Sequence, residues 1–406
     1  MGAPRAAPCS GGVRTWAGAL VYLARREQFS LAAASYPERR SARALPRHER
    51  NREAMSALVD EALLALLERH RNELRLHCYR MLGSSHDAED MLQEMAVRAW
   101  RAKASLTDMS NGRAWLYRIT TNVCLDVLKQ RRTRLLPFEA GPPAADPQVA
   151  LGAPEPDAFV EPCPDAWFAG AASDPAARYE MGQAVRLAFV AALQHLTPIQ
   201  RATLLLRDVV GLSAEETASA LELGLQATNS ALFRARTAID AKLAGHGAVE
   251  PSPVGGPLQE LLDRYLTAWN HIDIEAFVGL LHDEVKTTMP PVPTWIAGKP
   301  HNAAFYRPMF AAQRPGTFVV VPTAANRQAA FAFYRVLGPG ESYRLRAVQL
   351  VELRDGAIVS IDHFMLPELA SAFGLPGELG DLRGGEVGDA RSCLELAQAA
   401  IRRSQG

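Results

Sequence analysis

Residues 197–243 read TPIQRATLLLRDVVGLSAEETASALELGLQATNSALFRARTAIDAKL, and this stretch decides the fold around it. Thr197 and Gln200 have capping-box spacing, with Pro198 at the first helical position, so a helix should start here. Gly211 follows an apolar run and can adopt the left-handed conformation that ends a helix. The first part of the stretch therefore predicts a short, well-capped helix.

A second capping box follows at once. Ser213 and Glu216 predict the start of a second helix, and a short turn around Gly224 should lead into a third helix over residues 226–243. Apolar residues recur at helical spacing on one side of that third helix and should pack on the second. The spacing predicts a helix-turn-helix.

The outer face of the third helix is polar, apart from one aromatic ring. Its residues are Gln226, Asn229, Ser230, Phe233, Arg234 and Arg236. In a helix-turn-helix that binds DNA, Gln226 and Asn229 would reach base edges in the major groove. Arg234 and Arg236 would contact the phosphate backbone. The alternative is an ordinary three-helix packing unit with a solvated polar face.

Length and composition exclude several classes of protein. A chain of 406 residues has room for roughly two or three domains with their own cores. It has no apolar run long enough to span a bilayer, and its formal net charge of +0 gives no overall basic signature of a nucleic-acid binder. Its five cysteines form no C-x-x-C pair, which argues against a zinc site or a disulfide framework and fits a reducing, cytoplasmic location.

Residues 1–54 are dominated by Ala, Arg, Gly and Pro and show no sustained period. We interpret them as a disordered arm. A sharper hypothesis is that the natural start is Met55, where helical periodicity begins, and that the preceding segment is over-called upstream sequence.

Residues 55–135 predict a first helical module. Helical periodicity covers residues 56–82, where Gly83 should end the helix, with a break expected near His70. Ser84 or Ser85 should cap a second helix over residues 87–103, and a polar loop leads to a basic third helix over residues 113–134. Basic residues interleaved with aromatic ones suit a nucleic-acid backbone with exposed bases, although a charged solvent face is the plainer interpretation.

Residues 136–178 are rich in Pro and carry acidic residues with no basic counterpart before Arg178. This composition predicts a flexible linker between two modules. The second module would span residues 179–245, with the helix-turn-helix at its centre, and residues 246–257 form a second linker.

The last part of the chain has a different pattern. Residues 258–370 predict two helices followed by strands near 285–289, 317–322, 329–337, 343–354 and 357–364. Arg354-Asp355-Gly356 reads as the tight turn between the last two strands. The whole chain is thus expected to be multidomain, with all-α modules followed by an α+β domain and a tail over residues 371–406.

These patterns together resemble a known family. DAEDxxQE at 87–94 and WLYRIxxN at 115–122 look like region 2 of bacterial sigma-70 family factors of the extracytoplasmic-function (ECF) subfamily. LTPxQR at 196–201 through LxRAR at 232–236 is similar to region 4 of the same family. The last domain resembles the cone-shaped SnoaL-like (NTF2-like) fold that some ECF factors carry as a fused extension.

The resemblance implies a sigma factor that binds core RNA polymerase and directs promoter-specific initiation. Region 2 would melt and capture the promoter −10 element, while the 226–236 helix would read the −35 element. The acidic linker would enter the RNA channel, and region 4 would touch the β flap. Residues expected to dock on the β′ clamp helices are Asp87, Asp90, Gln93 and Glu94. Those expected at the −10 element are Asn122, Lys129, Arg131 and Arg132.

Two positions depart from the family pattern. Thr228 stands where an apolar β-branched residue is usual, so the base of the recognition helix should be less tightly packed. Phe233 stands where polar residues are common, so we expect it to contact thymine methyls or sugar, or to pack on another domain.

The SnoaL-like domain leaves more alternatives open. An apolar pocket for an unknown small molecule could be lined by Met289, Trp295, Phe305 and Phe364, although core packing is the commoner fate of such residues. Met289-Pro290-Pro291 stands where isomerases of this fold place a base, and Asp362 and His363 alternate on one strand, so only one can face inward.

We therefore expect no catalysis, no cofactor and regulation of the sigma modules in cis. The second interpretation is a polymerase-independent helix-turn-helix regulator with a ligand-sensing NTF2-like domain. The third is an enzyme fused to a DNA-binding arm.

Overall fold

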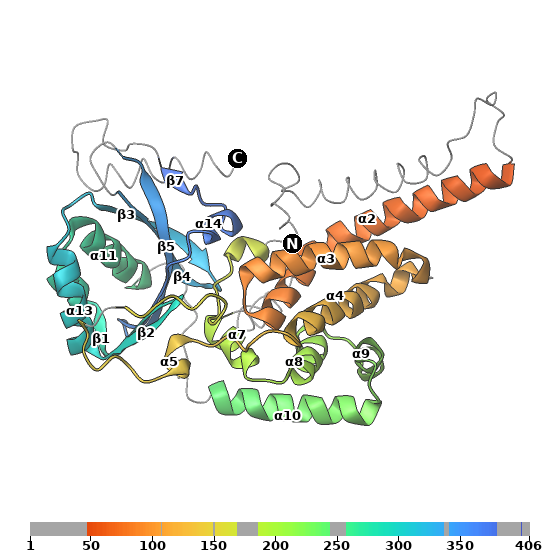
Figure 1. Cartoon of the computed structure of the whole chain (residues 1–406), viewed down its shortest axis with the longest axis horizontal. Coiled ribbons are helices and arrows are strands. Elements are labelled where there is room, and N and C mark those ends of the chain that lie inside the picture. Colours follow the sequence, from red (N-terminus) through yellow and green to blue (C-terminus); the bar gives the residue numbers. More distant parts are fainter. Residues whose placement is uncertain are drawn as a thin grey trace, which may run out of the picture.

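The computed structural model describes the two helical modules, most of the linker between them and the sheet domain (Figure 1). The described residues are 47–106, 108–148, 151–168, 186–243, 257–336, 341–379 and 399. Residues 1–46 of the expected arm, the end of the acidic linker, nearly all of the second linker and most of the tail lie outside these residues. Residues 47–54, which were expected to belong to a disordered arm, are helical. Among the described helices, none is long and apolar enough to cross a membrane.

The amino-terminal module packs three long helices, α2, Arg47–Leu82, α3, Ser85–Arg101, and α4, Gly112–Leu128. Gly83 ends α2 with a φ of +71°, and the Ser84 side chain caps α3 by accepting a hydrogen bond from the Asp87 amide. Two short 3₁₀ turns, η1, Lys103–Ser105, and η2, Met109–Asn111, connect α3 to α4. The predicted helix ends at Gly83 and the Ser84 cap are confirmed, whereas α2 has no break at His70.

The third helix is shorter than predicted. It ends at Leu128, and residues 129–134 form a turn and a loop. The reason is tertiary, because the Arg131 and Arg134 side chains turn back to pair with Asp87 at the start of α3. The basic residues therefore do not lie along one helical face.

The helix-turn-helix module contains α7, Leu187–Gln194, α8, Pro198–Leu204, the π-helical turn η4, Leu205–Val209, α9, Ala214–Leu221, and α10, Leu225–Leu243. Both predicted capping boxes are formed, at Thr197 and at Ser213. The left-handed residue between α9 and α10 is Glu222, with a φ of +56°, and Gly224 has no positive φ. Thr228 is buried, and its Oγ1 donates to the Gly224 carbonyl at 3.1 Å.

The linker is not a free tether over its described part. Residues 135–168 include α5, Pro137–Ala140, a 3₁₀ turn η3, Asp165–Phe168, and a bridge between Leu135 and Phe159. Its backbone also bonds to the sheet domain, where the Ala144 amide donates to the Trp295 carbonyl at 2.9 Å. The prediction of a flexible linker is therefore wrong here, because most of its large apolar side chains, among them Val160 and Trp167, are buried.

The sheet domain begins with α11, Pro257–His271, and α12, Ile274–Gly279. Its other elements are β1, Leu281–Met289, β2, Val292–Ala297, α13, Lys299–Ala311, β3, Phe318–Ala325, β4, Gln328–Arg335, β5, Tyr343–Arg354, β6, Ala357–Phe364, α14, Leu369–Ala372, and β7, Glu378–Leu379. The strand order is β2-β1-β6-β5-β4-β3, with β7 on β5, and only the β1–β6 pair is parallel. Positive φ angles at Asp355 and Gly356 confirm the predicted turn.

The two faces of this sheet have different neighbours. One face is covered by α11, α12 and α13, and it holds a packed aromatic cluster around Trp269, whose ring centroid lies 4.8 Å from that of Phe310. The opposite face carries Val348, Leu350 and Phe364, which belong to one continuous core with the helical modules and α14. The sheet domain thus packs on the two helical modules through buried apolar side chains.

Candidate functional site

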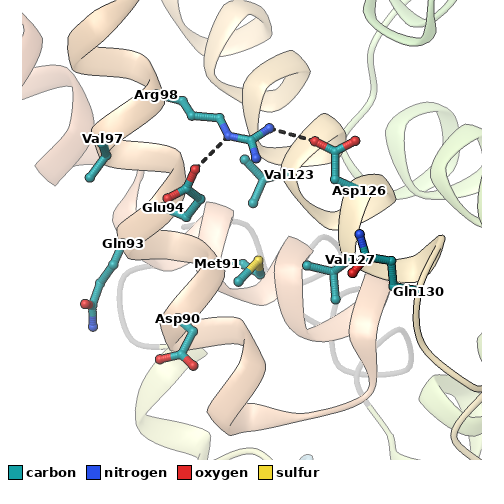
Figure 2. A pocket seen from close by; sticks show the side chains of 10 residues that line it. All are labelled: Asp90, Met91, Gln93, Glu94, Val97, Arg98, Val123, Asp126, Val127 and Gln130. Carbon is teal, nitrogen blue, oxygen red and sulfur yellow. Dashed lines mark hydrogen bonds and ion pairs between the residues drawn. The ribbon is translucent and has the colours of Figure 1, made fainter. Parts of the chain in front are cut away.

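A groove of about 570 Å³ runs between α3 and α4 (Figure 2). Apolar side chains from both helices lie along it, and acidic and amide groups lie beside them. The lining residues are Asp90, Met91, Gln93, Glu94, Val97, Arg98, Val123, Asp126, Val127 and Gln130. Three of the four predicted polymerase-docking residues, Asp90, Gln93 and Glu94, are therefore brought together beside an apolar floor. A groove of this kind can accept an amphipathic helix that carries basic residues.

Arg98 crosses the groove from α3 to α4. Its Nε donates to Glu94 Oε1 at 2.9 Å, and its guanidinium donates to Asp126 Oδ2 at 2.8 Å (Figure 2). Lys129 Nζ reaches the other oxygen of Asp126 at 3.0 Å. Hydrogen bonds from Arg98 and then Lys129 lower the pKa of Asp126, so this carboxylate remains ionised in neutral solution.

Asp87, the fourth predicted docking residue, does not face the groove. Its side chain is 7% exposed, and it accepts hydrogen bonds from Arg131 and from Arg134, the latter at 2.9 Å. Arg134 also pairs with Asp157 and Glu161 of the linker. We therefore correct the assignment of Asp87, because it anchors the linker side of the module and offers no surface to a partner.

The predicted −10 residues lie at the carboxyl end of α4 and beyond it. Lys129 is 72% exposed on its side chain, Arg132 is exposed, and Asn122 is half-buried within α4. Arg131 differs from them, because its guanidinium is committed to Asp87. Lys129 and Arg132 can reach a phosphate backbone from this place, whereas Arg131 would first have to leave its ion pair.

The predicted −35 residues share one face of α10. Ala231, Leu232, Ala235 and Ile239 are buried against the module, while Gln226, Asn229, Ser230, Phe233, Arg234 and Arg236 are exposed. Phe233 is 72% exposed, which is unusual for an aromatic ring. Arg236 donates to both oxygens of Asp208 at 2.7 and 2.8 Å, whereas Arg234 has no ion pair within the described residues. This exposed stripe of α10 side chains therefore has the residue types of a recognition helix that lies in the DNA major groove.

The two helical modules contact each other directly. The Arg201 side chain, only 2% exposed, donates to the Met81 carbonyl of α2 and to Gln194 of α7. Burial lowers its pKa to about 10. The sequence interpretation missed this residue, although its place directly after the first capping box marks it as the inward side of α8.

The four residues predicted to line a pocket in the sheet domain lie in different surroundings. Phe364 is buried in the core shared with the helical modules, and Phe305 packs on Tyr306 at the aromatic cluster. Trp295 Nε1 donates to the Gly141 carbonyl of the linker at 2.8 Å, and Met289 precedes the Pro290-Pro291 turn. The structure does not bring these side chains into one cavity.

Asp362 and His363 face opposite sides of β6. Asp362 accepts hydrogen bonds from Thr288 and Ser360, and burial raises its pKa to about 6. His363 lies against the ring of Phe333 in the aromatic cluster, and burial lowers its pKa to about 4, so it is neutral at pH 7. The prediction that only one of the two faces the covered side is confirmed, and that residue is His363.

Family profiles match three parts of the chain. Sigma-70 region 2 matches residues 66–134, Sigma-70 region 4 matches residues 186–239, and a SnoaL-like domain matches residues 262–361. These ranges coincide with the amino-terminal module, the helix-turn-helix module and the sheet domain. The order of the parts agrees with the order expected from the sequence.

Known sigma factors are similar to this chain over parts of different length. The ECF RNA polymerase sigma factor SigG of Mycobacterium tuberculosis (strain H37Rv) is 37% identical over 77% of this chain and 83% of its own length. SigE of Mycolicibacterium smegmatis is 31% identical over 45% of this chain and 62% of its own length. The crystal structure of Mycobacterium tuberculosis SigJ shares the fold, with a TM-score of 0.51 at 22% identity over 77% of this chain and 99% of that one.

The profiles and the SigG match agree with the geometry described above. Regions 2 and 4 supply the groove and the exposed stripe of α10, and a SnoaL-like domain follows them. The chain therefore belongs to the extracytoplasmic-function subfamily of RNA polymerase sigma factors, which bind the core enzyme and direct transcription initiation at specific promoters.

Proposed function

We propose that the groove between α3 and α4 docks on the clamp helices of the polymerase β′ subunit. Asp90, Gln93 and Glu94 supply acidic and amide acceptors, and Met91 and Val97 supply the apolar floor. Arginines on a docking helix would form charge-assisted hydrogen bonds with the two carboxylates while its apolar side covers the floor. The helix-turn-helix module would touch the β flap.

Promoter contacts divide between the two modules. Lys129, Arg132 and Asn122 would hold the opened −10 strand, with cationic groups on phosphates and the amide on a base. Gln226, Asn229 and Phe233 would face base edges of the −35 duplex, and Arg234 would contact its backbone. The exposure of these side chains, apart from half-buried Asn122, supports this division.

The two modules cannot make both contacts in the arrangement described here. The −10 and −35 elements lie at different places along the promoter, and each base pair between them adds about 3.4 Å of helix axis. In the structure α9 packs on α4, and Arg118 of α4 pairs with Glu222 at 3.1 Å. We infer that this is a closed state, and that the modules separate when polymerase and promoter bind.

The turn between β3 and β4 supports a role for the SnoaL-like domain in holding that state. Asn326, at the tip of the turn, is fully buried. Its Nδ2 donates to the Tyr79 hydroxyl of α2 at 2.8 Å. Its Oδ1 accepts from the Cys163 amide of the linker at 2.9 Å, and its own amide donates to the Cys163 carbonyl at 3.0 Å. One side chain thus joins three parts of the chain.

Neighbouring residues extend this contact. The Arg327 amide donates to Asp165 of η3 at 2.8 Å, and the Arg327 guanidinium lies over the Phe168 ring. Gln328 Oε1 accepts from the Leu187 amide at the start of α7 at 3.1 Å. The turn therefore contacts both modules and the linker between them.

We infer that the SnoaL-like domain inhibits the sigma modules in cis, taking the place of a separate anti-sigma protein. Linker carboxylates that would enter the RNA channel are engaged here, since Glu161 pairs with Arg134 and Glu139 pairs with His195. A role as an enzyme is not favoured, because aromatic side chains fill the covered face of the sheet. The buried contacts of Asn326 are the observation that carries the proposal.

Run-off transcription by core polymerase with the full-length protein tests it. Asn326→Gly keeps the positive φ of 53° accessible but deletes the side chain that joins the three parts. We expect it to raise initiation several-fold at limiting protein. Asp355→Asn, at the exposed β5–β6 turn, is the matched control and should leave initiation unchanged. Unchanged or lower initiation with a folded Asn326→Gly protein would contradict inhibition in cis.

A further inference from the structure

Four charged side chains form a continuous row from the docking groove toward the −10 contacts. Glu94 accepts from Arg98 at 2.9 Å, Arg98 donates to Asp126 at 2.8 Å, and Asp126 accepts from Lys129 at 3.0 Å. The row starts at a residue proposed to meet polymerase and ends at one proposed to meet DNA. Figure 2 shows its first three members, with the guanidinium of Arg98 between the two carboxylates.

The two middle members each divide their bonding between two partners. Arg98 donates hydrogen bonds to Glu94 on its own helix and to Asp126 on α4. Asp126 in turn accepts hydrogen bonds from both Arg98 and Lys129. Withdrawing a partner at one end therefore changes the bonding available at the other. All four groups are partly exposed, from 39% for Arg98 to 72% for Lys129, so they can exchange partners without an unpaired buried charge.

We propose that Arg98 and Asp126 are positioning residues that couple polymerase docking on Glu94 to the release of Lys129 for the −10 strand. The inference rests on the proposed docking face and on the proposed DNA contact of Lys129. When a basic side chain of the clamp helices pairs with Glu94, Arg98 turns fully to Asp126. Asp126 then holds Lys129 less firmly, and the ammonium becomes free to meet a phosphate.

The expected effect is modest. Exposed ion pairs in water are weak and are screened by salt, so the coupling should change DNA affinity by about two- to fivefold at low ionic strength. It should fade as salt is raised, which a change in folding would not reproduce. No covalent step is involved, and all four groups keep their charges throughout.

The test measures the anisotropy of labelled oligo(dT) with the full-length protein, with and without a saturating β′ clamp-helix fragment. For the unchanged protein we expect the fragment to tighten oligonucleotide binding. Asp126→Asn removes the charge that holds Lys129, so it should tighten binding without the fragment and leave the fragment little to add. Arg98→Gln leaves Lys129 as the only cationic partner of Asp126, so binding without the fragment should stay equal or weaken, and the fragment should again add little.

Tighter binding by Asp126→Asn but not by Arg98→Gln in the absence of the fragment, with a lost response to the fragment in both, identifies the row, since general damage would weaken binding in both. Arg307→Gln removes an exposed ion pair with Glu275 in the SnoaL-like domain and should behave as the unchanged protein. An equal response to the fragment in all variants would overturn the coupling, as would weaker binding by Asp126→Asn. Failure of the unchanged protein to bind the fragment in a direct titration would instead overturn the docking proposal.

Discussion

Asp87 and Asp90 stand three residues apart on α3 and have opposite surroundings. Asp87 is buried beneath the linker and pairs with Arg131 and Arg134, whereas the Asp90 side chain is 55% exposed at the groove. Both belong to one motif, DAEDxxQE, which gives no sign of the difference. The comparison teaches that a carboxylate in a docking motif can bind a partner only where the rest of the chain leaves it exposed.

The same contrast separates two faces of the amino-terminal module. The linker face is closed by Glu161, which accepts from the Ser84 hydroxyl at 2.7 Å and from the Ser85 amide at 3.0 Å at the start of α3. The groove face carries charges whose ion pairs are at the surface, such as Arg98 with Glu94 and Asp126. Substitutions on the first face should change stability, and substitutions on the second should change binding.

The largest effect on stability is expected at the centre of the linker face. Arg134→Ala would remove the buried partner of Asp87 and leave it only Arg131, whose side chain is 42% exposed, so we expect a loss of up to about 3–5 kcal/mol, the cost of breaking a buried ion pair from one side. Urea denaturation followed by circular dichroism should show this loss of unfolding free energy. Arg132→Ala is the control, because its exposed side chain should change stability by less than about 0.5 kcal/mol. Equal, small effects at both positions would contradict the expectation that the linker face determines stability.

The next effect is on polymerase binding by the groove face. Joint substitution of Asp90→Lys and Glu94→Lys should weaken capture of core polymerase by about a hundredfold, because like charges facing each other at an interface cost several kcal/mol. Pull-down and titration with core polymerase would measure it, while the melting temperature should change little. Glu275→Lys, an exposed position in the SnoaL-like domain, is the control. Undiminished capture would contradict docking through the groove and favour a regulator that acts without polymerase.

A buried carboxylate without an arginine should respond to pH. Burial raises the pKa of Asp362 from 3.8 to about 6, so its contribution to stability is full below pH 3.8 and is lost as pH rises through 6. Asp362→Asn should therefore stabilise the protein at pH 7 to 8 by up to about 3 kcal/mol, at ~1.4 kcal/mol per pH unit between the two pKa values.

Melting temperatures of Asp362→Asn and of the unchanged protein, measured between pH 4 and pH 8, test this expectation. The gain should shrink toward zero near pH 4. Asp355→Asn, at an exposed turn, serves as the control and should show no such trend. A gain of the same size at every pH would show that the charge of Asp362 is not its cause.

The smallest effect separates two neighbouring arginines of α10. Arg234 has no ion pair within the described residues, whereas Arg236 is held by Asp208. Arg234→Ala should lower the slope of log affinity against log salt for −35 duplex DNA by about one, as expected for one lost phosphate contact. Arg236→Ala should lower it less, because that guanidinium is already neutralised. Titrations of holoenzyme with labelled promoter at several salt concentrations would compare them.

Much of the fold could be predicted because its signals are local. The capping boxes at Thr197 and Ser213 and the Asp355-Gly356 turn depend on residues a few positions apart, and all three formed as expected. Strand β2 and helix α13 were not predicted. The prolines Pro293 and Pro308 interrupt the period by which each would be recognised.

The candidate site could be predicted only in part. Asp90, Gln93 and Glu94 follow one another on a single helix, so their common exposure could be inferred from helical spacing. Asp87 and Arg131 could not be told apart from the residues that remain candidates for contact with a partner, because their pairing joins positions 44 residues apart. Arg98 and Arg201 were missed for the same reason, since each acts through a partner on another helix.

The sequence by itself determined the order of the modules, the helix-turn-helix and the residues on its outer face, because capping and periodicity operate within a few residues. Only the tertiary structure decided that the acidic linker is packed and that Asn326 joins three parts of the chain. It also decided which charged side chains of α3 are exposed and which are buried. Those outcomes depend on apolar burial and ion pairing between segments that are distant in sequence, and no local pattern records which segments will meet.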